Sequence, residues 1–302
     1  MENNNIKTLE FQDTLSADKQ EKIITDGTSK PRRRGPVFET DIEIYEKDLS
    51  KSVLGEELFT NEYGVLKQKT TNELVLPGAL FVAEKLINSA SPIKPKTINQ
   101  DLGVSTVESD PGFTGKRREN VICLFGVGTG GAGTNFDTVV PVKYSERILQ
   151  GMVPMRRVPT GTDLSSAERN KYFLRKTNGG YYEYYLKKFE IDPTIHCVYD
   201  EAGNPSVPPN FDEVNPGKII NTYMQFNIKI SKDDVREYFK TAGGGISKAR
   251  INTLGLFIGY PVSEHGRTEY KGVQLFSKLN FNNEPLDNES KELNIIYKIY
   301  IS

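Results

Sequence analysis

The sequence predicts a mainly β protein with a few short helices, folded as an antiparallel β-sandwich or jelly-roll-like core with an extended N-terminal arm. Segments in which apolar and polar residues alternate recur from about Asn120 onward, as expected of strands with one buried face. Polar turn segments separate them, and the 302 residues include 26 Gly and 16 Pro to supply such turns. The strands do not alternate with long helical patterns, so a sandwich is favoured over a parallel sheet of βαβ units.

The first fifty residues differ from the rest of the chain. We expect an N-terminal arm or linker with a short helix over residues 1–50, and a β-rich globular domain over residues 51–302. One polar segment of the arm, bracketed by prolines, lacks the apolar periodicity that would let it bury itself. It contains three consecutive arginines, Arg32, Arg33 and Arg34. They form either a solvated loop or a docking strip for an acidic neighbour or nucleic acid.

Two helices are predicted inside the globular part. The first spans Leu76–Ile87, with Pro77 near its first position, where a missing N–H costs no hydrogen bond. The second spans Ser231–Lys240, because Ser231 followed by an acidic residue three positions later resembles a capping box. In this interpretation Asp233 and Asp234 lie in the first helical turn, where negative charge is favourable, and are not a catalytic pair of carboxylates.

The dipeptide Asn178-Gly179 predicts a β-hairpin, because these residues suit the two positive-φ positions of a type I′ turn. Counting outward gives the pairs Thr177 with Gly180, Arg175 with Tyr182, Phe173 with Tyr184 and Tyr172 with Tyr185. The hairpin tyrosines either pack the sheet or form an aromatic platform for a glycan; they are Tyr181, Tyr182, Tyr184 and Tyr185. Alternation predicts four further strands, at Tyr223–Ile230, Asn252–Tyr260, Gly272–Phe281 and Leu293–Ile301.

The glycine-rich stretch Gly126–Gly133 follows an apolar strand, Val121–Phe125, and formally matches the G-x-G-x-x-G pattern of dinucleotide-binding proteins. Such a site also needs a helix that starts at the glycines and an acidic residue ~20 positions farther on. Here β-branched residues and a proline follow instead, and residues 150–154 contain no carboxylate. We therefore predict a flexible loop that packs closely or contacts another subunit, through the glycines Gly126, Gly128, Gly130, Gly131 and Gly133.

Few residues are available for acid–base or metal chemistry. The chain has two histidines, His196 and His265, and two cysteines, Cys123 and Cys197. His196 and Cys197 are adjacent in a strand-like stretch and so point to opposite faces, which excludes a local Cys-His dyad. Neither a zinc-type spacing nor a calcium-loop pattern occurs. We expect no enzyme activity, no cofactor and no bound metal.

The charge is balanced, with 39 basic and 40 acidic residues, so no global field would draw the chain to nucleic acid or anionic lipid. The longest apolar stretch, Leu74–Leu86, is interrupted by charges and is shorter than the ~20 residues of a membrane helix. We expect a soluble protein without membrane contact. Contact with nucleic acid is expected only locally, through Arg32–Arg34.

Several segments resemble those of structural proteins of tailed-bacteriophage virions, particularly neck, collar and other head-to-tail or capsid-associated components. The segments are Leu124–Gly133, Met152–Val158, Ala249–Pro261, Leu275–Leu286 and Leu293–Ile301. The resemblance implies a β-rich, non-enzymatic protein that is present in rings and reaches its neighbours with extended arms. The partners would be copies of the chain itself, in a ring or layer, and other virion proteins.

The implied location is the virion, assembled in the cytoplasm of a bacterial host. Two other functions stay open. One is a carbohydrate-binding surface or decoration module centred on the tyrosine hairpin, and the other is a nucleotide-binding enzyme that uses the Gly126–Gly133 loop. The sequence alone leaves these alternatives to be decided by the arrangement of the residues in space.

Overall fold

In the computed structural model, the described residues are 40–49, 63–70, 73–87, 97–98, 120–133, 138–162, 164–198, 221–264 and 266–300. The predicted short helix of the N-terminal arm lies outside them. So do three residues proposed as a contact strip, Arg32, Arg33 and Arg34.

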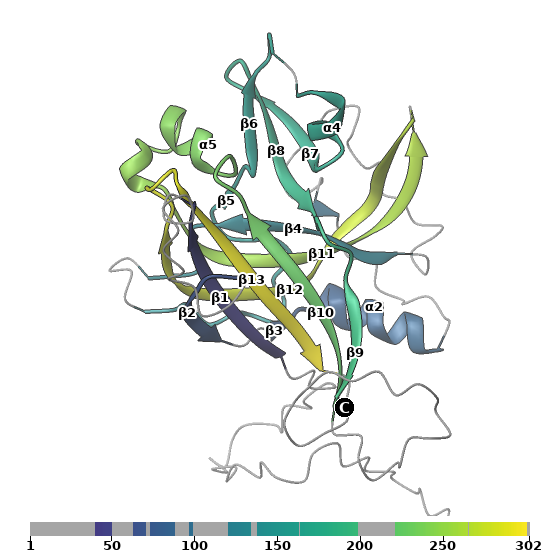
Figure 1. Ribbon diagram of the computed structural model, residues 1–302. Coiled ribbons are helices and arrows are strands. Elements are labelled where there is room, and N and C mark those ends of the chain that lie inside the picture. The colour runs from purple at the N-terminus through teal and green to yellow at the C-terminus, as the bar shows by residue number, and fades with distance from the viewer. Residues whose placement is uncertain are drawn as a thin grey trace, which may run out of the picture.

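Two antiparallel sheets form the body of the protein (Figure 1). The five-stranded sheet runs in the order β2 (Val65–Thr70), β1 (Thr40–Asp48), β13 (Lys291–Tyr300), β10 (Asn221–Ile230) and β9 (Thr194–Val198). The eight-stranded sheet runs in the order β3 (Glu73–Leu74), β12 (Arg267–Pro285), β11 (Arg250–Glu264), β4 (Val121–Gly128), β8 (Tyr181–Lys188) and β6 (Arg156–Pro159), with β5 (Met152–Val153) paired to β4 and β7 (Tyr172–Asn178) paired to β8. The predicted β-rich antiparallel sandwich is confirmed.

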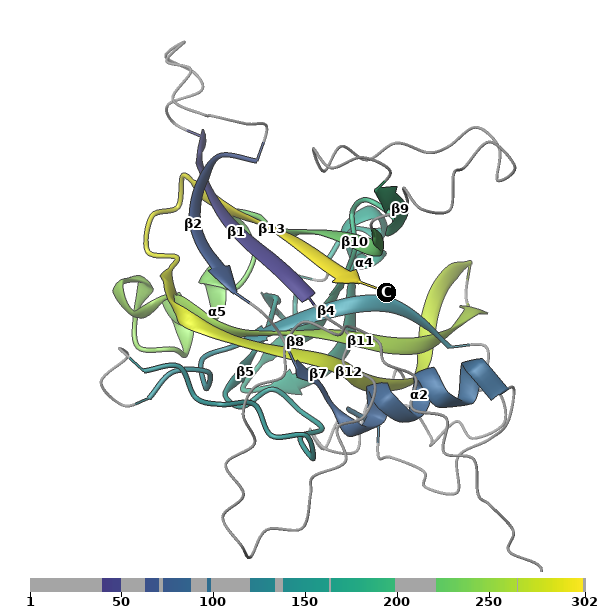
Figure 2. The ribbon, with the colours of Figure 1, turned by 90° about the horizontal axis from the view of Figure 1, so that it is seen from below.

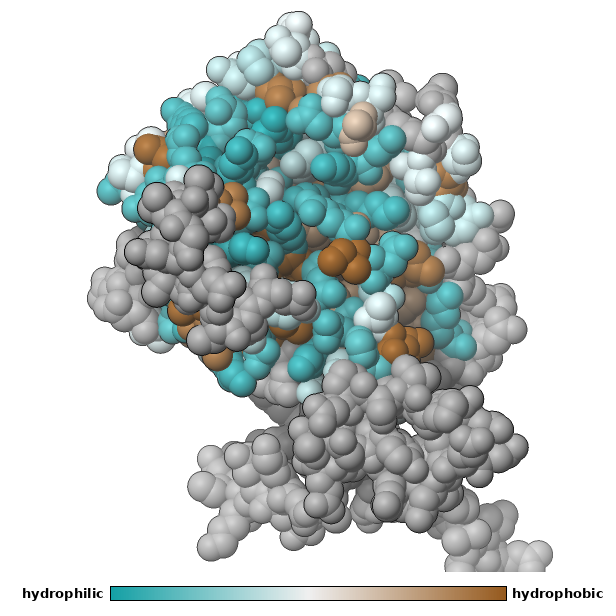
Figure 3. All heavy atoms as spheres, in the orientation of Figure 1, coloured by the Kyte–Doolittle hydropathy of each residue, from teal (hydrophilic) through white to brown (hydrophobic). Residues whose placement is uncertain are grey.

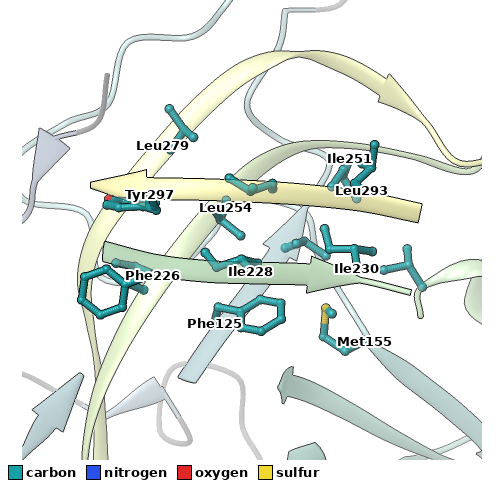
Figure 4. Packing of buried hydrophobic residues seen from close by; sticks show 14 of the residues in the cluster. Phe125, Met155, Phe226, Ile228, Ile230, Ile251, Leu254, Leu279, Leu293 and Tyr297 are labelled. Carbon is teal, nitrogen blue, oxygen red and sulfur yellow. The ribbon is translucent and has the colours of Figure 1, made fainter. Parts of the chain in front are cut away.

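The sandwich core lies between the two sheets, whose strands cross one another (Figures 1 and 4). Alternate residues of the five-stranded sheet point inward, among them Phe226, Ile228 and Tyr297, each at most 1% exposed. They pack against apolar side chains of the eight-stranded sheet such as Phe125 and Leu254 (Figure 4). The alternation that predicted the strands is therefore the alternation between this core and the outer face.

The eight-stranded sheet is covered on its far face as well. Leu124, Phe257 and Leu275 are the neighbours of core residues in their strands, so they point to the opposite face of the sheet. Each is fully buried there, at 0% exposed. They form a second apolar cluster together with Leu149, which lies between β4 and β5. Because both faces are buried, a central strand such as β11 reads as a nearly continuous apolar run.

Helix α2 (Leu76–Ile87) spans the predicted residues and lies along β12 (Figure 2). The rings of Phe81 and Phe276 meet edge to face, with 5.9 Å between their centroids. A Cβ atom at Gly78 would overlap the carbonyl oxygen of Phe276. Glycine at this position therefore allows the helix to approach the sheet closely.

The globular fold begins earlier than predicted. Thr40–Asp48, which the sequence analysis placed in the arm, is strand β1 and pairs with β13 on one side and β2 on the other. Its residues Ile42 and Ile44 are buried in the core, at 1% and 0% exposed. The strand was missed because its apolar residues are few and alternate with charged ones. Thr40–Asp48 therefore belongs to the folded sheet and not to the predicted arm.

The β7–β8 hairpin forms, but its turn differs from the predicted one. Gly179 and Gly180 occupy the turn with φ angles of 55° and 81°, and Asn178 pairs with Tyr181. Two glycines meet the positive-φ requirement without any Cβ penalty, so they displace Asn178 from the turn. The predicted pairs are wrong by a two-residue shift: Arg175 faces Tyr184, Phe173 faces Leu186 and Tyr172 faces Lys187.

Helix α5 (Arg236–Thr241) begins later than predicted. Ser231 N donates to Asp234 Oδ2 at 2.7 Å and Asp234 N donates to Ser231 O at 3.1 Å, so these residues close a turn of their own. Val235, with a φ of 67°, then separates this turn from the helix. Asp234 therefore does not lie in the first helical turn, and it is fully buried, at 0% exposed. Two further short helices are α4 (Ser166–Arg169) and the 3₁₀ helix Ile246–Lys248.

The buried tyrosines should make the fold sensitive to alkali. Burial raises the pKa of the phenols of Tyr172 and Tyr297, which are 5% and 0% exposed. Unfolded phenols ionise at about pH 10, whereas the folded protein retains these protons, so stability is complete below that pH and falls above it. Tyr297→Phe should reduce the slope of unfolding free energy against pH by about 1.4 kcal/mol per pH unit. Denaturant unfolding from pH 8 to 11 measures this, and an unchanged slope would contradict it.

Candidate functional site

Gly126 and Gly128 lie inside strand β4 and not in the predicted flexible loop. Strand β4 pairs with β11 on one side and with β5 and β8 on the other. A Cβ atom on Gly126 would lie 2.9 Å from Leu186 Cδ2, and one on Gly128 would lie 2.8 Å from the carbonyl oxygen of Gln150. The glycines therefore allow close packing within one chain. Contact of the five glycines with another subunit stays a prediction.

The backbone amides that follow β4 are used inside the chain. They donate as follows: Gly130 N to Gln150 O at 2.9 Å, Gly131 N to Asn252 Oδ1 at 2.6 Å, and Gly133 N to Thr138 O at 2.7 Å. A phosphate-binding loop must instead present such amides to its ligand, usually at the start of a helix. No helix occurs in residues 129–133 or 138–150, the described part of this region. The geometry gives no support to a nucleotide site.

The tyrosines of the hairpin are covered by cationic side chains. The guanidinium of Arg157 lies 3.6 Å from the ring centroid of Tyr181. Similar contacts, both at 4.7 Å, join Arg175 to Tyr182 and Arg169 to Tyr184. A sugar-binding platform needs an open ring face, whereas these rings take part in cation–π packing. The contacts therefore favour the sheet-packing interpretation over the glycan platform.

A buried ion pair lies beneath this layer. Arg157 Nε donates to Glu183 Oε1 at 3.0 Å, and the two side chains are 6% and 1% exposed. Tyr185 Oη donates to the other carboxylate oxygen, Glu183 Oε2, at 2.8 Å. The buried charges of Arg157 on β6 and Glu183 on β8 thus satisfy each other, as burial requires.

The second buried ion pair joins the two sheets and was not foreseen from the sequence. Lys187 Nζ lies 2.7 Å from Asp234 Oδ2, with the side chains 1% and 0% exposed. Tyr172 Oη donates to Asp234 Oδ1 at 2.7 Å, and Lys187 Nζ also donates to the carbonyl oxygen of Lys229 at 3.1 Å. Lysine in a strand usually marks an exposed face, and Asp234 suited a helix start, so neither residue gave a signal of burial.

The surroundings of Lys187 favour its charged form. Burial alone would lower the pKa of Lys187, but the charge and hydrogen bond of Asp234 outweigh burial and raise this pKa. A lysine that acts as a general base needs a lowered pKa. The geometry therefore assigns Lys187 a structural role.

The histidine and cysteine side chains form no reactive group among the described residues. The ring of His196 stacks on that of Tyr223, with centroids 5.1 Å apart and planes at 15°. Cys123 is buried, and burial raises the pKa of its thiol, which keeps it protonated. In the described ranges no cluster of three or more His, Cys, Asp or Glu could hold a metal. His265 lies outside these ranges.

Both outer strands of the five-stranded sheet expose apolar side chains. On β2, Val65 and Leu66 are 48% and 42% exposed, and on β9 Ile195 is 71% exposed; Ile191, in the segment that leads into β9, is 59% exposed. Within the part of the chain that the structure describes, no strand pairs with the outer side of β2 or β9. The face of the sheet between them is mainly hydrophilic (Figure 3). Unpaired edges with apolar residues are typical sites of protein contact.

Comparison with known proteins gave no match to a protein-family model, a curated protein or a solved structure. Among the described residues, no helix has both the length and the apolar character needed to cross a membrane. The function must therefore be argued from the contacts and surfaces of the chain itself.

The glycines after β4 should differ sharply in their tolerance of a methyl group. Gly131→Ala places a Cβ against the carbonyl oxygen of Asn252, whereas the nearest atom to a Cβ on Gly133 is Thr138 O at 3.5 Å. We expect Gly131→Ala to cost about 2–3 kcal/mol of stability and Gly133→Ala to cost little. Denaturant unfolding of both variants measures the difference. Equal stabilities would show that this segment is not closely packed.

Removing one partner of the Lys187–Asp234 pair should be more damaging than removing both. Lys187→Met leaves a buried unpaired carboxylate and should cost about 3–5 kcal/mol, and adding Asp234→Leu should recover a large part of it. The matched control is Lys69→Met, because Lys69 is 67% exposed and pairs with Glu43 at 2.7 Å. This control should cost less than about 1 kcal/mol. Chemical denaturation of the variants would contradict a paired role if the losses were simply additive.

Proposed function

We propose that this chain is a non-enzymatic structural protein of a tailed-phage virion, which assembles through subunit contacts into a ring or layer of the neck, collar or head-tail region. Its partners would be copies of itself and other virion proteins. The resemblance of five segments to such proteins supports the virion assignment, and the surfaces of the chain support assembly.

The observation that carries the proposal is the pair of open sheet edges. Ile191 and Ile195 are 59% and 71% exposed beside one edge, and Val65 is 48% exposed on the other. Open edges invite association, and here Lys67 and Lys69 on β2 and Pro193 before β9 accompany the exposed apolar residues and restrict which partners can approach. Apolar residues on both edges are expected of a subunit whose edges are covered by its neighbours.

The shape of the molecule also suits a subunit that reaches outward. Hairpin β11–β12 extends beyond the body of the sandwich, and the β7–β8 hairpin projects from its end (Figure 1). Residues near the β11–β12 tip, such as Pro261 and Thr268, are exposed. Such projecting hairpins give a neighbour a long surface to contact.

The two alternative functions receive less support from the contacts. A nucleotide site would need free amides after β4, but the amide of Gly131 donates to Asn252 at 2.6 Å. A glycan platform would need open tyrosine faces, but Tyr181 lies under Arg157 at 3.6 Å. Titration with nucleotides and a glycan array would reveal either function, and tight binding by the wild-type chain would favour that alternative.

Assembly can be tested on the purified full-length chain. We expect native mass spectrometry and sedimentation to show oligomers of defined copy number that grow with concentration. Ile195→Lys should shift them toward monomer, because it places a charge on an exposed apolar edge. Ser247→Lys, a change at an exposed position of the short 3₁₀ helix and outside both edges and both projecting hairpins, is the matched control and should leave assembly unchanged. A wild-type chain that stays monomeric at all concentrations would contradict the proposal.

The virion assignment needs a separate measurement. An antibody against the chain should label one level of tailed particles purified from the source of the sequence, and peptide mass spectrometry should find the chain in the particle fraction. Its presence only outside the particles would contradict the virion assignment while leaving assembly itself intact.

A further inference from the structure

We infer that the two edges of the five-stranded sheet bind each other in successive copies of this chain, with β2 of one copy against residues 190–195 of the next. This inference rests on the proposed assembly and names the surfaces that would carry it. The occupant of each edge is thus a second copy of the same chain.

Strand β2 and residues 190–195 carry opposite charges. Strand β2 carries Lys67 and Lys69 and no acidic residue, whereas residues 190–195 carry Glu190 and Asp192 and no lysine or arginine. Two of these charges are already paired inside the chain: Lys69 with Glu43 at 2.7 Å and Glu190 with Lys187 at 2.9 Å. The exposed residues Lys67 and Asp192 therefore carry the complementarity. Opposite charges on two surfaces guide them together and exclude wrong pairings.

The directions of β2 and β9 also suit pairing between successive copies. The sheet contains five strands and every neighbouring pair is antiparallel, so the first and last strands, β2 and β9, run in the same direction. If a second copy extends the sheet beyond β9 with its core on the same side, its strand β2 runs parallel to β9 of the first copy. In that approach, setting Leu66 beside Ile191 also sets Lys67 beside Asp192, because both pairs are consecutive in their segments.

The edges are less well suited to pairing with themselves. Two β2 strands would bring Lys67 and Lys69 of both copies together, and two 190–195 segments would do the same with Glu190 and Asp192. Like charges placed opposite each other are destabilising. The unlike edges avoid this repulsion and bury exposed apolar residues from both sides.

A contact between unlike edges has a consequence for the assembly. After each contact the assembly still has one unused edge of each kind, one at either end, so addition of copies can continue until the rotation between neighbours closes a ring. A contact between like edges would instead stop at a two-fold dimer. The proposed contact therefore explains how one small surface could produce a ring or a layer.

Cross-linking tests the pairing directly. In a Cys197→Ser background, which removes the thiol of β9, a short bis-maleimide should join Leu66→Cys to Ile191→Cys when the two variants are mixed. The double variant should give a ladder of covalent oligomers, because every copy then offers both thiols. Neither variant alone should cross-link beyond a Ser247→Cys control, which places a thiol at an exposed position of the short 3₁₀ helix. Self-cross-linking of Ile191→Cys alone would show that like edges meet and would overturn the inference.

Charge reversal gives an independent measurement. Lys67→Asp and Asp192→Lys should each raise the dissociation constant by about three- to tenfold, and the two together should restore most of the affinity. Lys248→Glu, a reversal at an exposed residue of the short 3₁₀ helix and in neither edge, is the control and should have no effect. Failure of the double reversal to restore affinity would overturn the pairing of these two residues.

The outcomes separate the inference from the proposed function. Wild-type oligomers without cross-links between residues 66 and 191 would overturn the edge pairing and leave the structural role in place. A wild-type chain that is monomeric under all conditions would overturn both. A ladder from the double variant, together with recovery on double charge reversal, would support the edge pairing.

Discussion

The passage of the chain from β8 to β9 holds the two sheets together. Lys187, at the end of β8, reaches Asp234 and the carbonyl oxygen of Lys229, which belong to the region where β10 ends. Immediately afterwards the ring of Phe189 contacts those of Phe125 and Phe226, with centroids 5.7 and 5.5 Å apart. The contacts of Lys187 and Phe189 thus join the β7–β8 hairpin, the turn before α5 and the five-stranded sheet in one region.

This arrangement requires the surrounding polar groups to be complete. A buried carboxylate is costly unless it is paired and hydrogen-bonded. Asp234 accepts hydrogen bonds from Tyr172 Oη at 2.7 Å and from Ser231 N at 2.7 Å in addition to its contact with Lys187. The need of Asp234 for several partners also explains why residues 231–234 form a turn of their own and not the first turn of helix α5. The carboxylate of Asp234 binds Tyr172 and Lys187 on distant strands as well as the backbone N–H of Ser231.

The sequence predicted local structure well and distant contacts poorly. Helix α2 was predicted to the residue because its periodicity and Pro77 are contained in one short segment. The hairpin turn was misplaced by one residue because Asn-Gly and Gly-Gly both satisfy a type I′ turn, and only packing decides between them. The Lys187–Asp234 pair could not be predicted, since it joins two segments whose proximity depends on the whole sandwich. The sequence placed the five glycines together in a flexible loop, whereas Gly126 and Gly128 lie in strand β4, a position that depends on the order of the sheet.

The pairing of β1 with β13 sets the order in which this fold can be completed. Thr40 lies opposite Ile299, so β1, the first described strand, cannot complete its pairing until β13, the last one, has been made. Contacts so distant in sequence slow folding, because the cost of closing the loop precedes the gain from pairing. During synthesis, Ile42 and Ile44 lack this pairing until β13 has left the ribosome. A ribosome that stops shortly before β13 would therefore release a polypeptide whose five-stranded sheet lacks its central strand and is prone to aggregation.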